Sequence, residues 1–152
     1  PNLIKNSVQL SFIGDLSQFD QDLIVQMKKS EQLTSCKGRD KNLDLVVAAS
    51  YGGRWDIVNA INEIKNQGTD ILVTEETFNS FLSTSAFEDP DLCIRTGNET
   101  RVSNFLLWQM AYSELYFPDI LWPDFDDDKF ESALIEYAKR SRRFGDKSNF
   151  QL

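Results

Sequence analysis

A nearly continuous apolar run at residues 43–49 constrains the fold of this chain more than any other segment. Its sequence, Leu-Asp-Leu-Val-Val-Ala-Ala, lacks the alternation of a strand with one solvent-facing side and is typical of a buried strand in a parallel sheet. Two further strand-like runs, at residues 8–13 and 91–95, alternate with helical patterns along the chain. This alternation predicts an α/β fold with a mostly parallel sheet, helices on both faces of the sheet and right-handed crossovers.

Helical patterns fill the segments between and after these runs. They cover residues 18–33, 54–64, 74–82, 104–113 and 126–143. In the second pattern, four apolar side chains share one face, which predicts the face that packs on the core; they are Ile57, Val58, Ile61 and Ile64. Ser103 is a favourable N-cap for the helix expected from Asn104. We expect residues 1–152 to form a single α/β domain.

The composition excludes several classes of function. The 152 residues include 24 acidic and 16 basic side chains, which gives a net charge of −8. Nonspecific binding to nucleic acid is therefore not expected, and an anionic ligand must be met by a local basic site. The chain has no histidine, which removes a Ser-His-Asp triad and any zinc site that needs imidazole.

Cysteine usage and hydropathy indicate a cytoplasmic protein. Cys36 and Cys93 lie far apart and form no CxxC pair, as expected of small core residues in a reduced chain. No secretory signal is visible at the start of the sequence. The longest apolar segment, residues 105–117, is interrupted by polar residues and is too short to span a bilayer, so any membrane contact would be peripheral.

Charged residues gather in one loop between two apolar segments. Arg95 and Arg101 flank Gly97 and Glu99, and Ser103 follows directly after them. Arginine offers paired donors that match phosphate oxygens, and a carboxylate between the cations can hold a magnesium ion that bridges those oxygens. The pattern favours a diphosphate site. A surface loop whose charges neutralise each other is the alternative.

A second carboxylate stands in an apolar setting. Glu114 lies within an otherwise apolar run, where an unpaired charge would be costly. We therefore expect it to have either a metal ion or an arginine as partner, and spacing alone leaves both open.

Several long motifs, taken in order, resemble the cis-prenyltransferases of the undecaprenyl diphosphate synthase type. The matching segments are LDLVVAASYGGR at 43–54, DPDLCIRTG at 89–97, SNFLLWQ at 103–109, AYSELYF at 111–117, LWPDFD at 121–126 and RRFG at 142–145. The resemblance implies an undecaprenyl diphosphate synthase-like fold and cis-prenyl chain elongation. In that reaction isopentenyl diphosphate is condensed onto an allylic diphosphate such as farnesyl diphosphate, with Mg²⁺, to give a Z-polyprenyl diphosphate. It also implies a homodimer.

The resemblance assigns roles to particular positions. Arg95, Arg101 and Ser103 match the residues that hold the diphosphate of isopentenyl diphosphate, with Gly97 and the backbone of Val102 in the same loop.

Other matching positions concern the metal and the partner subunit. Glu114 matches the acidic residue associated with the magnesium site, and Glu99 is a weaker second candidate. Arg143 and Gly145 match a C-terminal element that reaches toward the substrate of a partner subunit.

The match also has gaps. The family's His-Pro-Asp-Gly-Asn-Gly-Arg-Trp-type loop has no counterpart, so its catalytic aspartate is expected before Pro1, the fold is expected to be incomplete at the N-terminus and no catalytic residue is expected in this chain. Asn98 replaces the usual second glycine, and Thr100 replaces a common histidine. Because asparagine tolerates left-handed dihedrals, we expect the loop to keep its shape.

Two interpretations stay open at this point. In the first, the chain is the C-terminal portion of an active prenyltransferase and carries the isopentenyl diphosphate half-site. In the second, it is a noncatalytic partner subunit, or a truncated and inactive remnant, that contributes a dimer surface. An unrelated anion-binding α/β domain is a weaker third.

Overall fold

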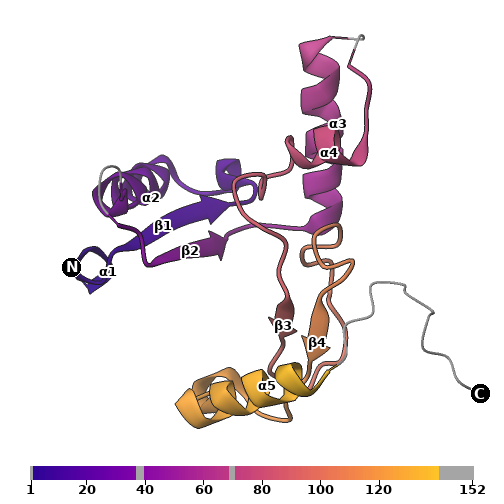
Figure 1. Cartoon of the computed structure of the whole chain (residues 1–152). Helices are drawn as coiled ribbons and strands as arrows, with labels where there is room; N and C mark the ends of the chain where they lie inside the picture. Colours follow the sequence, from indigo (N-terminus) through magenta and orange to yellow (C-terminus); the bar gives the residue numbers. More distant parts are fainter. Residues whose placement is uncertain (1, 37–39, 69–70, 141–152) are drawn as a thin grey trace, which may run out of the picture. The chain divides into compact units, whose positions relative to one another are not determined.

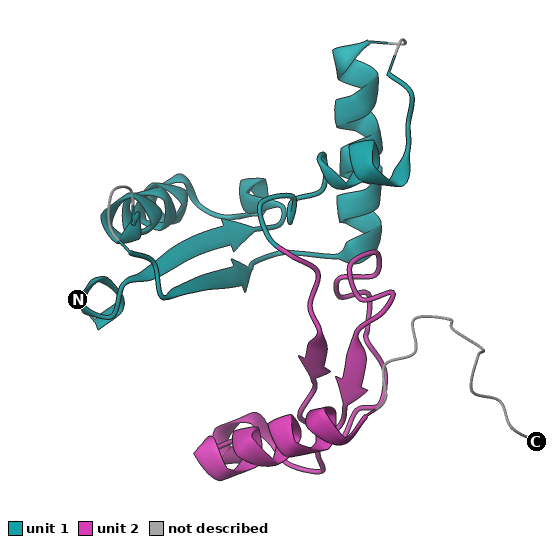
Figure 2. Ribbon diagram, viewed as in Figure 1, with its two compact units in different colours: residues 1–87 teal, residues 88–152 magenta. Residues whose placement is uncertain are grey.

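The computed structural model describes residues 2–36, 40–68 and 71–140, and the chain divides into two compact units, residues 1–87 and residues 88–152 (Figures 1 and 2). Each unit contains one pair of parallel strands together with helices, which confirms the predicted α/β class. Among the described residues the strands form two separate pairs rather than one sheet. That both units belong to a single domain stays a prediction.

Unit 1 is built around the parallel pair β1 and β2. Its elements are α1 (Asn2–Lys5), β1 (Val8–Ile13), the 3-10 helix η1 (Leu16–Gln18), α2 (Gln21–Thr34), β2 (Leu43–Ala48), α3 (Gly53–Gln67) and α4 (Glu75–Asn79). The register runs from Val8 opposite Leu43 to Ile13 opposite Ala48. The helix expected from residue 18 begins three residues later, because Asp15 caps η1 by accepting a hydrogen bond from the N–H of Ser17.

Side chains of α2 cover one edge of β1. The N–H of Leu10 donates to Thr34 Oγ1 at 3.1 Å, and the N–H of Phe12 donates to Glu31 Oε1 at 2.8 Å. These acceptors satisfy backbone donors that would otherwise form an open strand edge, which is prone to pair with other chains.

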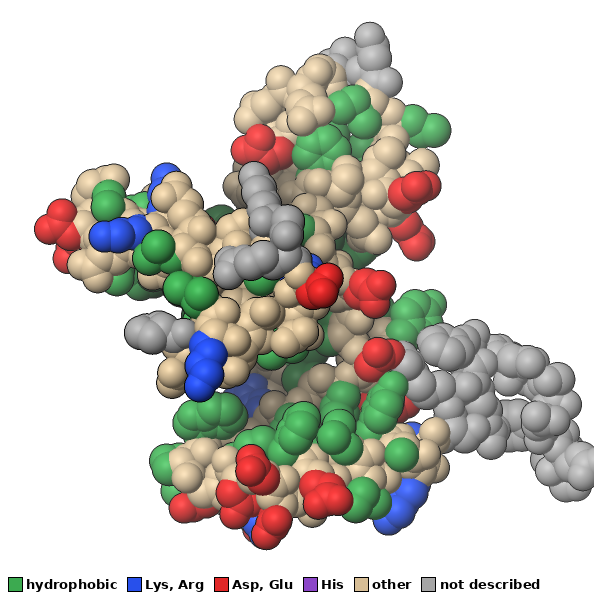
Figure 3. Space-filling model, turned by 60° about the vertical axis from the view of Figure 1, so that its left-hand side comes forward, with side chains coloured by type: hydrophobic (Ala, Val, Ile, Leu, Met, Phe, Trp, Pro, Cys, Tyr) green, Lys and Arg blue, Asp and Glu red, His purple; other side chains and the backbone are tan. Residues whose placement is uncertain are grey.

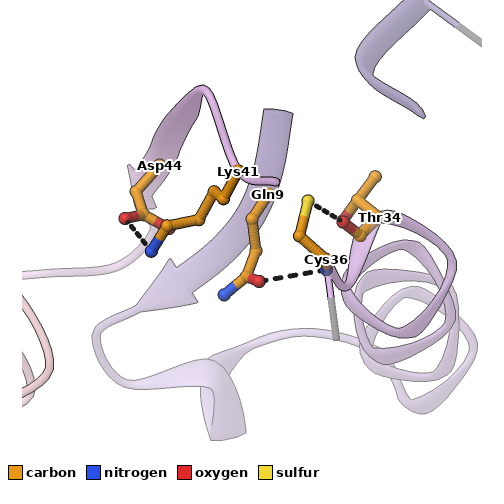
Figure 4. Close-up of polar contacts among 5 residues, drawn as sticks. All are labelled: Gln9, Thr34, Cys36, Lys41 and Asp44. Carbon is orange, nitrogen blue, oxygen red and sulfur yellow. Dashed lines mark hydrogen bonds and ion pairs between the residues drawn. The ribbon is translucent and has the colours of Figure 1, made fainter. Parts of the chain in front are cut away.

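Polar contacts lie at the end of α2 and at the start of β2 (Figure 4). Gln9 Oε1 accepts a hydrogen bond from the N–H of Cys36 at 3.3 Å, and Lys41 forms a 2.6 Å ion pair with Asp44. Cys36 is a free and buried cysteine, as predicted for a small core residue.

The predicted burial of β2 is wrong, although β2 is a parallel strand as predicted. Leu43, Leu45 and Val47 are 57%, 40% and 37% exposed. Within unit 1, α1 and α2 pack against β1. The continuous apolar run therefore encodes a strand that this unit leaves partly uncovered.

The core face of α3 differs from the predicted one. Its buried residues are Gly53, Asp56, Ala60 and Ile64. Val58 and Ile61, which were expected in the core, are exposed. A charged residue takes their place: Asp56 is fully buried, and its two oxygens accept hydrogen bonds from the Tyr51 hydroxyl and the N–H of Ser83, each at 2.9 Å.

Unit 2 contains the second parallel pair and the last helix. Its elements are β3 (Leu92–Ile94), β4 (Glu114–Tyr116), the 3-10 helix η2 (Trp122–Asp124) and α5 (Asp127–Lys139). Asp126 caps α5 by accepting a hydrogen bond from the N–H of Lys129 at 3.0 Å. Figure 3 shows apolar side chains gathered on the exposed side of α5, which include Phe130, Leu134 and Ile135.

The helix predicted from Asn104 is wrong. Residues 104–112 form turns, and Ser103, Asn104 and Leu106 have φ angles of +46°, +63° and +42°, which a right-handed helix does not contain. A crossover between parallel strands is usually helical, so the pairing of β3 with β4 does not itself account for the turns. The three left-handed residues interrupt the helical backbone, and the spacing of apolar residues does not reveal them.

We expect Asp56→Ala to lower the free energy of unfolding by about 3 kcal/mol, because it removes a charged acceptor from two buried or part-buried donors. Asp56→Asn keeps one carbonyl acceptor and should cost less. Glu63→Ala, at an exposed position of the same helix, is the control and should stay within about 0.5 kcal/mol of wild type. Urea unfolding measures all three, and equal midpoints for Asp56→Ala and Glu63→Ala would contradict the role of Asp56.

Candidate functional site

The charged loop begins where β3 ends. Leu92, Cys93 and Ile94 lie opposite Glu114, Leu115 and Tyr116 in parallel register. The pairing continues past the strand, since the N–H of Arg95 donates to the Tyr116 carbonyl at 2.9 Å and that of Gly97 to the Ile120 carbonyl at 2.7 Å. In α/β folds, ligands bind beyond the carboxyl ends of parallel strands, and the loop occupies this place.

Arg95 closes the loop on itself. Its Nη1 donates to Ser103 Oγ at 2.8 Å and also to the backbone carbonyl of Arg101. The Ser103 side chain was expected to cap a helix, but it accepts this hydrogen bond instead. One guanidinium therefore joins both ends of the segment from 95 to 103, since it contacts the Ser103 side chain and the Arg101 backbone.

Arg101 is the accessible cation of the loop. Its guanidinium forms an ion pair with Glu99, and the two side chains are 69% and 36% exposed. Exposed pairs contribute little to stability, so an anionic ligand can replace Glu99 at small cost. The loop carries two arginines against one glutamate, which leaves it locally cationic in an acidic protein.

The backbone of the loop turns through left-handed conformations. Gly97 has a φ of +90° and Asn98 a φ of +58°. Asn98 therefore has the left-handed dihedral that asparagine tolerates, and the likeness of the loop to that of the family stays a prediction. The N–H of Gly97 already donates to the Ile120 carbonyl, so the left-handed conformation of this residue serves the turn of the chain. Val102 contributes a backbone group to the turn, because its carbonyl accepts a hydrogen bond from the N–H of Phe105 at 3.1 Å.

Glu114 lies apart from this loop. As the first residue of β4 it is opposite Leu92, and its Oε2 is 2.8 Å from Arg140 Nη1. Of the two partners that the sequence left open, the structure contains the arginine. Arg140 itself was not predicted. The available signal was a carboxylate in an apolar run together with an arginine at the end of the last helix.

Oxygen donors suited to magnesium are present, but they are not clustered. Within residues 2–36, 40–68 and 71–140 no group of three metal-ligating side chains occurs. Magnesium in phosphate sites commonly takes only one or two carboxylates and completes its shell with water and phosphate oxygens. Glu114 can offer one oxygen to such a partial shell, whereas Glu99 lies in the charged loop and pairs with Arg101. Their assignment as metal ligands stays a prediction, and Arg143 and Gly145 lie outside the described residues.

Cys93 lies next to the loop without being a candidate nucleophile. Burial raises the pKa of its thiol, and the positive charge of Arg95 acts in the opposite direction. The thiol form therefore dominates at neutral pH. This agrees with the prediction that the cysteine is a small packing residue.

Comparison with known proteins identifies the family. A family model described as "Putative undecaprenyl diphosphate synthase" matches residues 1–145. A ditrans,polycis-undecaprenyl-diphosphate synthase of Yersinia pseudotuberculosis, specific for (2E,6E)-farnesyl diphosphate, is 48% identical over 151 residues, which are 95% of this chain and 58% of the relative. An isoprenyl transferase of Neisseria gonorrhoeae is 46% identical over 143 residues, which are 94% of this chain and 56% of the relative.

Solved structures agree with the sequence relatives. A "probable undecaprenyl diphosphate synthase" of Campylobacter jejuni aligns with a TM-score of 0.81 at 34% identity. The alignment covers 93% of this chain and 65% of the Campylobacter chain. Lavandulyl diphosphate synthase of Lavandula x intermedia, solved with dimethylallyl diphosphate, aligns with a TM-score of 0.83 at 35% identity. The alignment covers 91% of this chain and 61% of the Lavandula chain.

The matched proteins are α/β prenyltransferases by name and by fold. The chain belongs to the undecaprenyl diphosphate synthase family. It spans just over half the length of the sequence relatives compared above. Among the described residues, no helix is long and apolar enough to cross a bilayer.

We expect Gly97→Ala to destabilise the loop by about 1 kcal/mol, because its φ of +90° is strained for any residue with a Cβ. Space is not the cause, since an added Cβ would meet no atom within 4 Å. Asn98→Gly is the matched control, because glycine accepts a positive φ without strain. Thermal unfolding should show a lower midpoint for Gly97→Ala only; equal losses in both variants would indicate that the side chains matter instead.

Proposed function

We propose that this chain carries the isopentenyl diphosphate half-site of a cis-prenyltransferase. The complete enzyme would condense isopentenyl diphosphate onto an allylic diphosphate such as farnesyl diphosphate and give a Z-polyprenyl diphosphate, the precursor of a cell-wall lipid carrier. The observation that supports this proposal most is the grouping of Arg95, Arg101 and Ser103 in one loop at the carboxyl end of β3.

Each loop residue has a distinct role in the proposal. Arg101, which is the more exposed cation, would exchange Glu99 for the diphosphate. Arg95 would hold the Ser103 hydroxyl in place and add positive charge behind it. Gly97 would let the chain turn, and the backbone of Val102 would lie along the ligand. Diphosphate recognition by paired guanidinium groups is strong because both partners are charged.

The chain's share of the reaction would be orientation. In the condensation, the new carbon–carbon bond would form as the allylic diphosphate loses pyrophosphate, and the isopentenyl unit would lose a proton to restore a double bond. A second substrate held by its diphosphate is placed for attack without further loss of rotational freedom. A bound magnesium ion would neutralise charge on the diphosphates. Glu114 would belong to its site, with Glu99 as a weaker second ligand.

The proposal extends to assembly and location. A homodimer would let the C-terminal residues Arg143 and Gly145 reach a partner's substrate, and the exposed apolar side of α5 is available for contact with another subunit. A cytoplasmic location would suit the substrates, and peripheral contact with a membrane would suit an apolar product.

A noncatalytic partner subunit is the second candidate. The observation in its favour is the set of exposed apolar side chains on α5, which suit contact with another subunit. In this role the chain would raise the activity of a full-length family member when the two are mixed, and a chain that changes nothing would argue against it.

We expect Arg101→Met to weaken binding of isopentenyl diphosphate at least tenfold, because a charged hydrogen bond is worth about 1.5–3 kcal/mol. Isothermal titration of the 152-residue chain measures this. Lys129→Met, which removes one exposed positive charge elsewhere in unit 2, is the matched control and should bind as wild type does. Equal weakening by both variants would mean that net charge, not the loop, attracts the ligand.

We expect the 152-residue chain alone to make no polyprenyl product from farnesyl diphosphate and isopentenyl diphosphate. The reason is that its sequence has no counterpart of the aspartate loop described above. Radiolabelled isopentenyl diphosphate, followed by extraction of apolar products, tests this with a full-length family member as positive control. Detectable elongation would show that another residue performs the role of that aspartate.

A further inference from the structure

We propose that Arg140 is a positioning residue that holds the Glu114 carboxylate in the orientation needed at a magnesium–diphosphate site. The inference rests on the proposed function, in which Glu114 belongs to that site. It adds a residue that neither the sequence motifs nor the comparisons assign.

The contacts of Arg140 are unusually well defined for a side chain near the surface. Its Nη1 lies 2.8 Å from Glu114 Oε2 and 2.9 Å from the backbone carbonyl oxygen of Leu115. The Arg140 backbone is also fixed, since its N–H caps α5 through a 3.1 Å hydrogen bond to the Tyr137 carbonyl. The guanidinium therefore contacts two successive residues of β4, namely Glu114 through its side chain and Leu115 through its carbonyl. It belongs to the residue that ends α5.

Shielding separates this ion pair from the one in the loop. The Arg140 and Glu114 side chains are 30% and 28% exposed, whereas Arg101 is 69% exposed. A shielded ion pair whose arginine also bonds to the backbone holds its geometry better than a solvent-exposed pair. Glu99 can therefore leave Arg101 readily, while Glu114 is kept in place by Arg140.

This arrangement fits a carboxylate that acts through one oxygen. Arg140 contacts Oε2 of Glu114, and a magnesium ion that is bound mainly by water and phosphate needs one oxygen from such a residue. Carboxylates that bind metals are commonly oriented by a second hydrogen-bonding residue, and loss of that residue weakens metal binding by about 10- to 100-fold. Arg140 has the position and chemistry of such a residue.

The test uses the full 152-residue chain with inorganic pyrophosphate as the probe. Pyrophosphate binding is measured by isothermal titration across a series of magnesium concentrations, for wild type, Arg140→Met, Arg140→Lys and Glu114→Gln. Lys139→Met is the matched control. It removes the same charge one residue earlier, and Lys139 takes part in none of the ion pairs of the described residues. Circular dichroism checks that each variant is folded.

We expect Arg140→Met to raise the magnesium concentration at half effect about tenfold, with pyrophosphate binding in the absence of magnesium unchanged. Arg140→Lys should lie between wild type and Arg140→Met, because an ammonium group keeps the charge but not the planar pair of donors. Glu114→Gln should raise the magnesium concentration at half effect by a similar factor. A variant that combines Arg140→Met with Glu114→Gln should raise it no further, since both residues act through one contact. Lys139→Met should match wild type.

Other outcomes distinguish a failure of the Arg140 role from a failure of the proposed diphosphate site. An unchanged or lower magnesium midpoint in folded Arg140→Met would overturn the inference and leave the diphosphate loop standing. The same holds if wild type binds pyrophosphate without any effect of magnesium. A wild-type chain that binds no pyrophosphate, or binds it equally well as Arg101→Met, contradicts the proposed diphosphate site and the inference with it.

Discussion

Parallel pairing of β3 with β4 is the constraint on which the candidate site depends. Parallel strands cannot be joined by a tight turn, so the chain must travel back along the strands between Ile94 and Glu114. That return path contains the charged loop and its left-handed residues. The same pairing places Arg95 directly after the carboxyl end of β3, where its N–H still bonds to β4 and its side chain is available for the loop. The two three-residue strands thus fix the points at which the connecting segment leaves β3 and enters β4.

The Glu99–Arg101 and Glu114–Arg140 ion pairs of unit 2 differ in how far apart their residues lie in the sequence. Glu99 and Arg101 belong to one loop and are close in sequence, so their contact costs little chain entropy and is readily exchanged. Glu114 and Arg140 are 26 positions apart and join a strand to the end of a helix. Their contact forms only when the unit is folded. An exchangeable pair suits a residue that meets the ligand, and a fixed pair suits one that must stay in place.

Local signals in the sequence predicted local features well. The strand at residues 8–13 and the tolerance of Asn98 for a positive φ both depend on neighbours in the chain. Features that depend on distant residues were missed. The exposure of β2 depends on which elements cover it, and the partner of Glu114 depends on where the end of α5 packs. The turns after Ser103 were missed because helical spacing of apolar residues does not reveal left-handed backbone conformations. Asp56 was overlooked because a helix face is normally read from its apolar residues, and here a carboxylate with two donors fills the core.

Two polar clusters belong to different units of the chain. Arg95, Ser103 and Tyr116, which form hydrogen bonds in and beside the charged loop, are residues of unit 2. Tyr51, Asp56 and Ser83, which form the buried cluster, are residues of unit 1. Asp56 variants are therefore a reference for variants at Gly97 and Arg140. A loss of ligand binding that parallels the loss of stability, as expected for Asp56→Ala, indicates unfolding, whereas a loss of binding without a loss of stability indicates a direct effect on the proposed site.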